Sequence, residues 1–142
     1  MSENCVFCKI VSGEIKACKI DEDDKSIVFL DTSPVFHGHC LISPKEHFET
    51  LMDVPVARLE PLFSKAQLVA RAVEKGLGSD GSFIAINNRV SQTVPHLHVH
   101  VIPRKRKDGM KGFFWPRHKY RDEAHMEETR QALQSAMAAL KA

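Results

Sequence analysis

The sequence contains no long apolar run, because its longest unbroken apolar stretches have only four or five residues, at 27–30 and 136–140. A membrane-spanning helix needs about 20 apolar residues, so no membrane partner is expected. The first residues also lack the basic flank and apolar core of a secretory signal, which makes the cytoplasm the expected compartment. A chain kept reduced there is not expected to build a disulfide framework from its four cysteines, Cys5, Cys8, Cys18 and Cys40.

Charge of one sign is not in large excess either, since 20 Lys and Arg against 18 Asp and Glu give a net charge of +2. This balance does not indicate a nucleic-acid partner. The charge is uneven, however: the segment 104–121 holds eight Lys and Arg and one Asp, so it either attracts phosphates or forms a solvated loop. The length of 142 residues, with 43% hydrophobic and 27% charged residues, is typical of one globular domain and excludes a disordered chain.

Periodicity and turn residues predict the local structure. Short apolar runs between turn formers predict strands at 26–30, 39–42, 82–87 and 96–102. A helical turn is expected over 5–13, and a long helix from about Asp53 to Gly76 and Gly78, with Pro61 ending its first turn. A last helix is expected over 122–140, with a buried stripe of Leu133, Met137 and Leu140. These elements indicate an α+β domain with an antiparallel sheet.

Three histidines alternate with apolar residues between Pro95 and Pro103. A period of two is typical of a strand with one buried face, so the core is expected to contain Leu97, Val99 and Val101. The other face would then carry His96, His98 and His100, roughly 6.6 Å apart from one to the next. The flanking prolines are expected to limit this strand to about seven residues. A single histidine is most often a structural polar residue, whereas three in register favour a chemical role.

Two chemistries use such an array. Alternate histidines on a strand can bind one divalent metal ion. Alternatively, a neutral imidazole can attack phosphorus and form a covalent intermediate, with the middle residue His98 as the nucleophile. In that case an acceptor must hold the other ring nitrogen of His98 to fix the tautomer. The residues alone leave both chemistries open.

The run His96-Leu-His-Val-His-Val-Ile102 resembles the histidine-triad motif of the HIT superfamily, in which three histidines alternate with hydrophobic residues. Further segments resemble that family in the same order, at 5–14, 29–34, 38–47 and 91–94, so the resemblance covers about residues 5–103. It implies a HIT-like fold over 1–142: an antiparallel sheet of about five strands, a long central helix, and a C-terminal helix in an extension over 104–142.

The resemblance also implies a hydrolase or nucleotidyl transferase acting on the α-phosphate of purine nucleoside phosphoramidates or dinucleoside polyphosphates. His98 would become nucleotidylated, and water or another acceptor would resolve the intermediate. His100 and His39 would lie beside the phosphate, and Gln92 and Thr93 would contact the phosphate or the leaving atom. No cofactor would be needed for catalysis, and the sequence has no glycine-rich phosphate loop.

The nucleoside would be bound by residues that also have plainer interpretations. Asp31 would accept hydrogen bonds from the ribose hydroxyls, although an aspartate before Thr-Ser-Pro is also a turn former. The base pocket would be lined by apolar residues that otherwise suit the core, namely Phe7, Ile10, Phe29 and Val6. Asn87 would contact the phosphate or ribose, but the following loop lacks the glycine common in the family, so it must approach the ligand differently.

Cys5 and Cys8 form a C-x-x-C pair that by itself suits a redox pair, half of a zinc site, or two core residues. Some HIT proteins with this segment bind structural zinc, and the matching ligands here are Cys5, Cys8, His47 and His96. Two thiolates and two imidazoles would make a closed tetrahedral site with a structural role. Cys18 and Cys40 are expected to be small apolar filler.

The basic and aromatic segment after the triad could stack a base and hold phosphates, or form a dimer contact through Trp115. HIT proteins are usually homodimers, so the resemblance implies a homodimer here. Two rival functions remain: a metal-dependent hydrolase with the triad as ligands, and a nucleotide-binding or scaffold protein without catalysis. Activity in a chelator discriminates the first rival, and turnover of an adenosine phosphoramidate discriminates the second.

Overall fold

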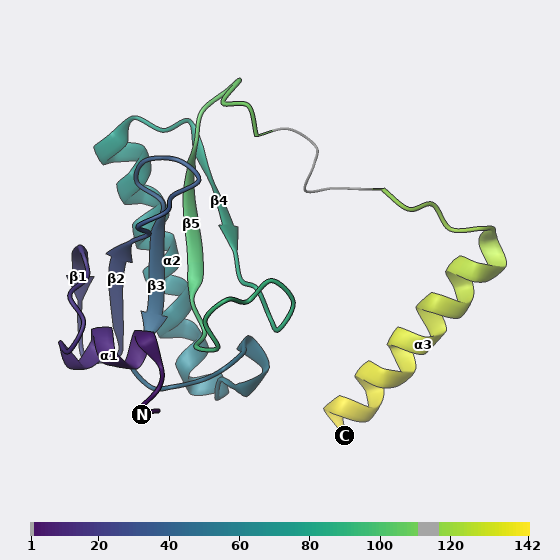
Figure 1. The fold of residues 1–142 in the computed structure, drawn as a ribbon. Coiled ribbons are helices and arrows are strands. Elements are labelled where there is room, and N and C mark those ends of the chain that lie inside the picture. Colours follow the sequence, from purple (N-terminus) through teal and green to yellow (C-terminus); the bar gives the residue numbers. More distant parts are fainter. Residues whose placement is uncertain (1, 111–116) are drawn as a thin grey trace. The chain divides into compact units, whose positions relative to one another are not determined.

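The computed structural model describes residues 2–110 and 117–142, which fall into two compact units, Met1–Asp108 and Gly109–Ala142. The first unit contains the whole sheet, and the second contains the C-terminal helix (Figure 1). The elements in chain order are α1 (Val6–Ser12), β1 (Lys19–Glu22), β2 (Ser26–Leu30), β3 (Cys40–Pro44), the 3-10 helix η1 (Leu51–Asp53), α2 (Val56–Leu77), β4 (Gly81–Ala85), β5 (Val99–Arg104) and α3 (Glu123–Lys141).

The five strands form one antiparallel sheet in the order β1-β2-β3-β5-β4, which confirms the predicted fold class. Helices α1 and α2 lie on opposite faces of this sheet (Figure 1). Because both faces are covered, β2 and β3 are buried along almost their whole length. The sheet is therefore the middle layer of the first unit.

Alternation along the strands separates two hydrophobic clusters. Val28, Ile42, Val99 and Val101 pack with α2, whereas Phe29 and Leu41 pack with Phe7 and Cys8 of α1. His100 lies opposite Leu41 in the register of β5 and β3. Neighbouring residues in register point to the same face, so the His100 side chain belongs to the α1 face of the sheet.

The predicted triad strand is correct in its alternation but wrong in its bounds. Leu97, Val99 and Val101 have no exposed surface, as the period of two predicted. The strand begins only at Val99, because the backbone N–H of Leu97 donates to Phe48 O at 2.7 Å instead of joining the ladder. It also continues through Pro103 to Arg104, beyond the last pairing of β5 with β3 at Val101. A proline is tolerated there because the strand has lost one neighbour.

The other predicted elements differ in detail. The 5–13 turn is the helix α1, ended by Gly13 at φ 84°. Asp53 belongs to η1 rather than to the long helix, because its carboxylate accepts from the N–H and hydroxyl of Thr50. Pro61 lies inside α2, which runs past Gly76 to Leu77 and ends at Gly78. The fourth predicted strand ends at Ala85 rather than Asn87.

Two features were not expected from the sequence. β1 is an additional edge strand whose four residues are all exposed, so it carries no apolar pattern. Helix α3 begins after Asp122 as expected, but the predicted buried stripe is wrong: exposed fractions are 61% for Leu133, 55% for Met137 and 86% for Leu140. Among the helices of the described residues, none has the length and apolar character needed to cross a membrane.

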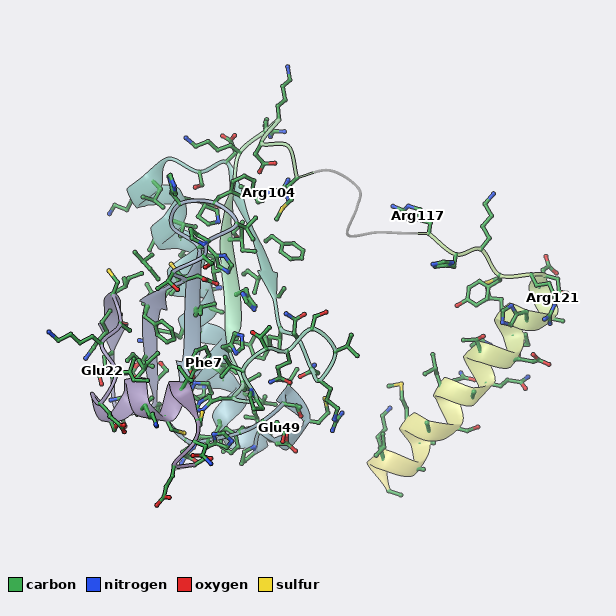
Figure 2. All side chains as sticks on the ribbon, in the orientation of Figure 1. Phe7, Glu22, Glu49, Arg104, Arg117 and Arg121 are labelled. Carbon is green, nitrogen blue, oxygen red and sulfur yellow. The ribbon has the colours of Figure 1, made fainter. Side chains whose placement is uncertain are left out.

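The basic segment begins as an ordered turn. Arg104 Nε pairs with Asp108 Oδ2 at 2.5 Å, and the N–H of Arg106 donates to Asp80 Oδ2 at 2.9 Å. Figure 2 shows Arg117 and Arg121 farther along this segment, where both side chains are exposed. Trp115 and its aromatic neighbours fall within 111–116, outside the described residues.

Gly38 supports a prediction about the turn that leads into the triad's neighbouring strand. Its φ is 95°, and a Cβ there would contact the Leu77 side chain and lie 3.2 Å from Pro103 Cγ. We expect Gly38→Ala to lower the free energy of unfolding by about 2 kcal/mol, from backbone strain together with overpacking. Gly81→Ala is the control, because its Cβ would have no neighbour within 4 Å. Urea unfolding measures both, and equal effects would contradict this explanation.

Candidate active site

The protonation of His98 is set by its own backbone neighbourhood. Its ring is only 6% exposed, and Nδ1 lies 2.7 Å from the His96 carbonyl oxygen. A carbonyl can only accept, so Nδ1 carries the proton and donates it. Burial lowers the pKa of His98 below the usual value for histidine. At neutral pH, Nε2 is therefore an unprotonated nitrogen with a free lone pair.

A chain of hydrogen bonds likewise determines which ring nitrogen of His100 carries the proton. The N–H of Val35 donates to His39 Nδ1 at 3.1 Å, so His39 carries its proton on Nε2. His39 Nε2 then donates to His100 Nδ1 at 2.9 Å, which leaves the proton of His100 on Nε2. His100 Nε2 is buried and has no hydrogen-bond partner among the described residues. It is therefore an N–H donor available to a ligand.

A pocket of about 340 Å³ opens beside these two histidines. Its volume falls within the range of about 300–1,000 Å³ that is usual for small-molecule sites. Eight of the residues proposed from the sequence line it together: His98, His100, Asp31, Thr93, Phe7, Ile10, Phe29 and Val6. Figure 2 shows Phe7 on α1 in front of the sheet, where it forms part of the pocket wall.

Asp31 forms the turn that was one of its two interpretations, and it also lines the pocket, while its ribose contact stays a prediction. Its Oδ1 accepts from the N–H of Ser33 at 2.8 Å, which closes a turn. Its Oδ2 lies 3.7 Å from His39 Nε2, and the residue lines the pocket. One carboxylate oxygen therefore holds the turn, while the other remains near the ligand space.

Three predicted residues lie elsewhere. His39 is behind His100 rather than on the pocket wall, and it acts on the pocket through that ring. Gln92 accepts from the N–H of Arg89 at 2.8 Å and donates to Glu49 O at 2.6 Å, so its amide binds the loop backbone. Neither Gln92 nor Asn87 lines the pocket.

The sequence did not single out several other lining residues. Leu41 and Val94 contribute apolar wall, and Lys16 contributes a positively charged side chain. Leu41 faces the pocket because of its register opposite Phe29 and His100, which only strand pairing determines. No sequence pattern indicated Lys16 as a site residue, because the strand that follows it, β1, was not predicted.

A second cluster forms beside the pocket from Cys5, Cys8, His47 and His96. Their four ligand atoms all lie within 4.8 Å of one another. The Cys5 Sγ to His96 Nδ1 distance is 3.3 Å, Cys8 Sγ to His47 Nδ1 is 3.3 Å, and His47 Nδ1 to His96 Nδ1 is 3.1 Å. A tetrahedral zinc site has S···N edges of about 3.5 Å and N···N edges of about 3.3 Å, from its usual bond lengths. The four atoms thus match the size and donor set of such a site.

The protonation states of this cluster also bear on whether it can bind a cation. His96 Nε2 donates to Pro44 O at 2.8 Å, so His96 Nδ1 presents a lone pair to the cysteines. Burial raises the pKa of the Cys8 thiol, so a metal ion would have to displace its proton on binding. His96 itself has no exposed surface, and burial lowers its pKa to about 4. A neutral, oriented imidazole is what a metal ligand requires.

By contrast, Asp31, His39 and His100 also lie within 4.8 Å of one another but do not suit a metal. The atom of His39 that faces this group is Nε2, which is protonated because Nδ1 accepts from Val35. A protonated ring nitrogen has no lone pair for a metal ion. Since His96 turns to the cysteines and His98 to a carbonyl, the three triad rings do not converge on one point either.

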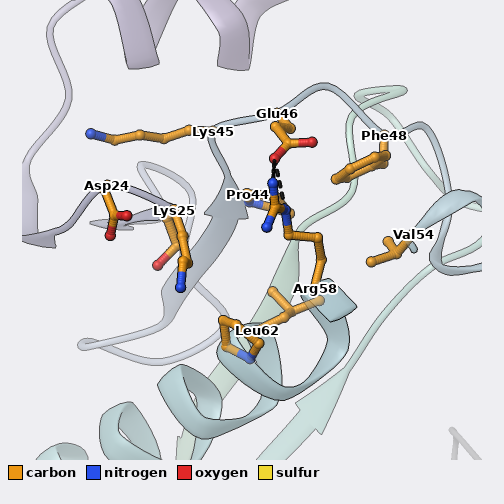
Figure 3. A pocket seen from close by; sticks show the side chains of 11 residues that line it. Asp24, Lys25, Pro44, Lys45, Glu46, Phe48, Val54, Arg58 and Leu62 are labelled. Atoms are coloured by element: carbon orange, nitrogen blue, oxygen red, sulfur yellow. Dashed lines mark hydrogen bonds and ion pairs between the residues drawn. The ribbon is translucent and has the colours of Figure 1, made fainter. Parts of the chain in front are cut away.

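Another cavity lies between the β2–β3 hairpin and the start of α2 (Figure 3). Its volume is about 40 Å³, and its walls include Phe48, Val54 and Leu62. The exposed pair of Glu46 and Arg58, 2.8 Å apart, lies on its rim. This cavity is far too small to hold a nucleotide.

The buried histidines predict a pH dependence of stability. Burial lowers the pKa of His100 to about 4. The neighbouring His98 and His39 also lower this pKa, whereas Asp31 raises it. The stability contributed by this neutral ring is present above pH 6.5 and is lost as the pH falls from about 6.5 to about 4. Each such histidine adds a slope of about 1.4 kcal/mol per pH unit in that window.

We therefore expect the free energy of unfolding of His100→Gln to depend less steeply on pH than that of the wild type. The difference in slope should correspond to about one proton taken up on unfolding. Urea unfolding between pH values of about 4.5 and 6.5 measures the slope. His37→Gln, at an exposed position outside the pocket, is the control and should keep the wild-type slope. Parallel curves for all three proteins would contradict the burial of a neutral His100.

Comparison with known proteins connects this geometry to a family. The family model described as HIT domain matches residues 12–107. Adenylylsulfatase HINT3 of Arabidopsis thaliana is 42% identical over 110 residues, which are 76% of this chain and 56% of that protein. The chain thus spans little more than half the length of that relative. Adenosine 5'-monophosphoramidase hnt1 of Schizosaccharomyces pombe is 37% identical over 118 residues, covering 80% of this chain and 84% of that protein.

Solved structures agree. SMU.412c from Streptococcus mutans superposes with a TM-score of 0.87 at 33% identity, covering 96% of this chain and 87% of that one. A Zn-bound histidine triad family protein from Mycobacterium smegmatis has a TM-score of 0.72 at 38% identity, covering 96% and 97% of the two chains. Because the family model spans most of the chain and these relatives align along it, the chain belongs to the HIT family.

Proposed function

We propose that this chain hydrolyses purine nucleotide conjugates at the α-phosphate, through a nucleotidyl intermediate on His98. The substrate class is a nucleoside phosphoramidate or a dinucleoside polyphosphate. The observation that carries the proposal is the His98 ring, whose Nδ1 donates to the His96 carbonyl while Nε2 is left unprotonated beside the pocket. Two relatives named as an adenylylsulfatase and an adenosine 5'-monophosphoramidase support an adenylyl group as the part recognised.

The reaction has two steps. The lone pair of His98 Nε2 forms a bond to the α-phosphorus, and the bond from phosphorus to the leaving nitrogen or oxygen breaks. The leaving group keeps that electron pair and takes a proton from solvent. Water then forms a bond to the same phosphorus and loses a proton, and the N–P bond breaks to release the nucleotide and neutral His98. The Nδ1–H bond to the His96 carbonyl stabilises the positive ring of the intermediate.

The other pocket residues position the substrate. His100 Nε2 donates to a non-bridging phosphate oxygen, and His39 keeps the proton of His100 on that nitrogen. Asp31 Oδ2, which the turn does not use, accepts from the ribose hydroxyls. Phe7, Ile10, Phe29 and Val6 form the apolar surface against which the base packs. Thr93 contacts the phosphate side, while roles for Gln92 and Asn87 remain predictions.

The two rival functions are less well supported. A metal-dependent hydrolase would need the triad rings to share one ion, but their hydrogen bonds turn them to three different partners. A binding module would not need an unprotonated ring nitrogen beside a buried N–H donor that has no partner in the described part of the chain. Nucleophilic displacement at phosphorus requires such an arrangement, in which the lone pair of His98 Nε2 lies near the N–H donor of His100.

We expect His98→Ala to lower kcat/KM for a fluorogenic adenosine phosphoramidate by at least about 10³-fold, because the attacking atom is removed. Mass spectrometry of quenched wild-type reactions should find an AMP group on His98. His37→Ala is the control, because His37 is exposed and does not line the pocket. A wild-type protein that binds AMP well but turns over none of the adenylated substrates would refute the hydrolase and favour the binding module.

We also propose that Cys5, Cys8, His47 and His96 hold one structural zinc ion. Two sulfur and two nitrogen ligands close a tetrahedral site, which leaves no position for substrate or water. The zinc-bound M. smegmatis protein supports the assignment. Bound zinc would supply a cross-link between α1, the loop after β3 and the triad segment. The homodimer and the cytoplasmic location remain predictions.

Metal analysis of the purified chain tests this site. We expect about one zinc ion per chain, and expect Cys8→Ser to lose most of it, because one of four ligand bonds is removed. Cys18→Ser is the matched control, since Cys18 is exposed and lies outside the cluster. Equal zinc content in the two variants, or none in the wild type, would contradict the assignment.

A further inference from the structure

His96 belongs to two structures at once. Its ring nitrogen Nδ1 lies within the four-residue cluster, 3.3 Å from Cys5 Sγ and 3.6 Å from Cys8 Sγ. Its backbone carbonyl accepts the Nδ1–H of His98 at 2.7 Å. The ring has no exposed surface, and its Nε2 is tied to Pro44 O. Both the side chain and the backbone of His96 are therefore held by neighbouring groups.

Phe7 makes a second connection between the cluster and the nucleophile. It lies next to Cys8 on α1, and its ring meets the His98 ring edge to face at a centroid distance of 4.9 Å. The same ring contacts His96 at 5.9 Å and Phe29 at 5.3 Å. The N-cap residue Cys5 and Cys8 thus lie at the start of the helix whose Phe7 side chain packs on His98 and lines the pocket.

We propose that His96 is a positioning residue, which transmits the state of the Cys5–Cys8–His47–His96 cluster to the tautomer and orientation of His98. This inference rests on the proposed function and on the proposed metal site. When the cluster is filled, the His96 ring is fixed and its carbonyl is directed at His98 Nδ1. The catalytic competence of His98 then depends on a site that never touches the substrate.

The physical reason lies in the atoms of the cluster when no cation is present. His47 Nδ1 and His96 Nδ1 are 3.1 Å apart, and His96 Nδ1 carries a lone pair because its proton is on Nε2. Without a cation, His47 can carry its proton on Nδ1 and donate to His96 Nδ1, so only hydrogen bonds, and not bonds to one central ion, hold the four ligand atoms together. The His96 ring is then held less firmly, and because the residue is fully buried, a change in the ring's orientation also shifts its backbone. The hydrogen bond that selects the His98 tautomer is then weakened.

A purely structural role for the cluster would have a different consequence. In that case, losing the metal would lower stability but would leave the His98 ring and the chemical step of the remaining folded protein unchanged. The test must therefore read His98 directly, rather than activity alone. Nitrogen NMR of the imidazole rings distinguishes a ring protonated on Nδ1 from one protonated on Nε2.

His47 is the residue to change, because it belongs to the cluster but does not line the pocket. His47→Asn removes one ligand, whereas His47→Cys replaces it and keeps a closed four-ligand set. Glu46→Gln is the control on the same loop, since it breaks only the exposed ion pair with Arg58 (Figure 3). For each protein, zinc content, kcat, KM and the nitrogen signals of His98 are measured.

We expect His47→Asn to lose zinc, to show a mixture of His98 tautomers, and to lower kcat by about 10²-fold with a smaller change in KM. His47→Cys should restore zinc, the Nδ1-protonated ring and most of kcat, and Glu46→Gln should match the wild type. A zinc-free His47→Asn that keeps a single Nδ1-protonated His98 and the wild-type kcat would overturn the inference.

Two further outcomes are also decisive. If His47→Asn does not fold, the His98 signals are followed in the wild type while zinc is removed by a chelator and then returned. A reversible change of tautomer supports the coupling, and an unchanged signal overturns it. If the wild type itself turns over no adenylated substrate, the proposed hydrolase fails, yet the tautomer measurement still decides whether His96 couples the two sites.

Discussion

The hydrogen bond from His98 Nδ1 to the His96 carbonyl determines what the site can do. It gives the proton to one ring nitrogen and leaves the lone pair of the other to the pocket. Without it, a buried imidazole would divide between two tautomers, and only one of them could attack phosphorus. The bond exists because His96 and His98 precede β5, where the chain bonds to Phe48 instead of forming ladder pairs. The irregular start of that strand is therefore what frees a carbonyl to orient the ring.

One face of the sheet carries the apolar core, and the other carries the candidate active site. On one face, α2 packs on Val28, Ile42, Val99 and Val101, which gives an entirely apolar core. On the other face, the short helix α1 covers Phe29 and Leu41 but leaves His100 only partly buried beside the pocket. This incomplete cover removes enough water to keep the histidines neutral, as the lowered pKa values of His39, His98 and His100 indicate, while it admits a ligand.

Much of this arrangement could be predicted from the sequence, and the exceptions have physical reasons. The alternation of His96 to Val101 predicted the core residues correctly, because side-chain period is a local property of extended chain. Eight lining residues of the pocket and the four residues of the cysteine cluster followed from the resemblance of the motifs, whereas Leu41, Val94 and Lys16 did not. The place of His39 did not, because only the pairing of β3 with β5 puts its ring behind His100. β1 was missed since an exposed edge strand carries no apolar pattern. The stripe on α3 was expected to be buried, but periodicity indicates only that a face is apolar, not what covers it.

Two histidine groups lie side by side in this fold, and the position of a single proton separates their roles. In the group around His96, the partner is the carbonyl of Pro44, an acceptor, so the opposite nitrogen has a lone pair and suits a metal ion. In the group around His39, the partner is the N–H of Val35, a donor, so the opposite nitrogen carries a proton and serves as a hydrogen-bond donor. The two rings compared are both histidines and are similarly buried, with exposed fractions of 0% for His96 and 3% for His39. The difference comes from whether a backbone acceptor or a backbone donor meets the far side of the ring, which follows from how each loop leaves its strand.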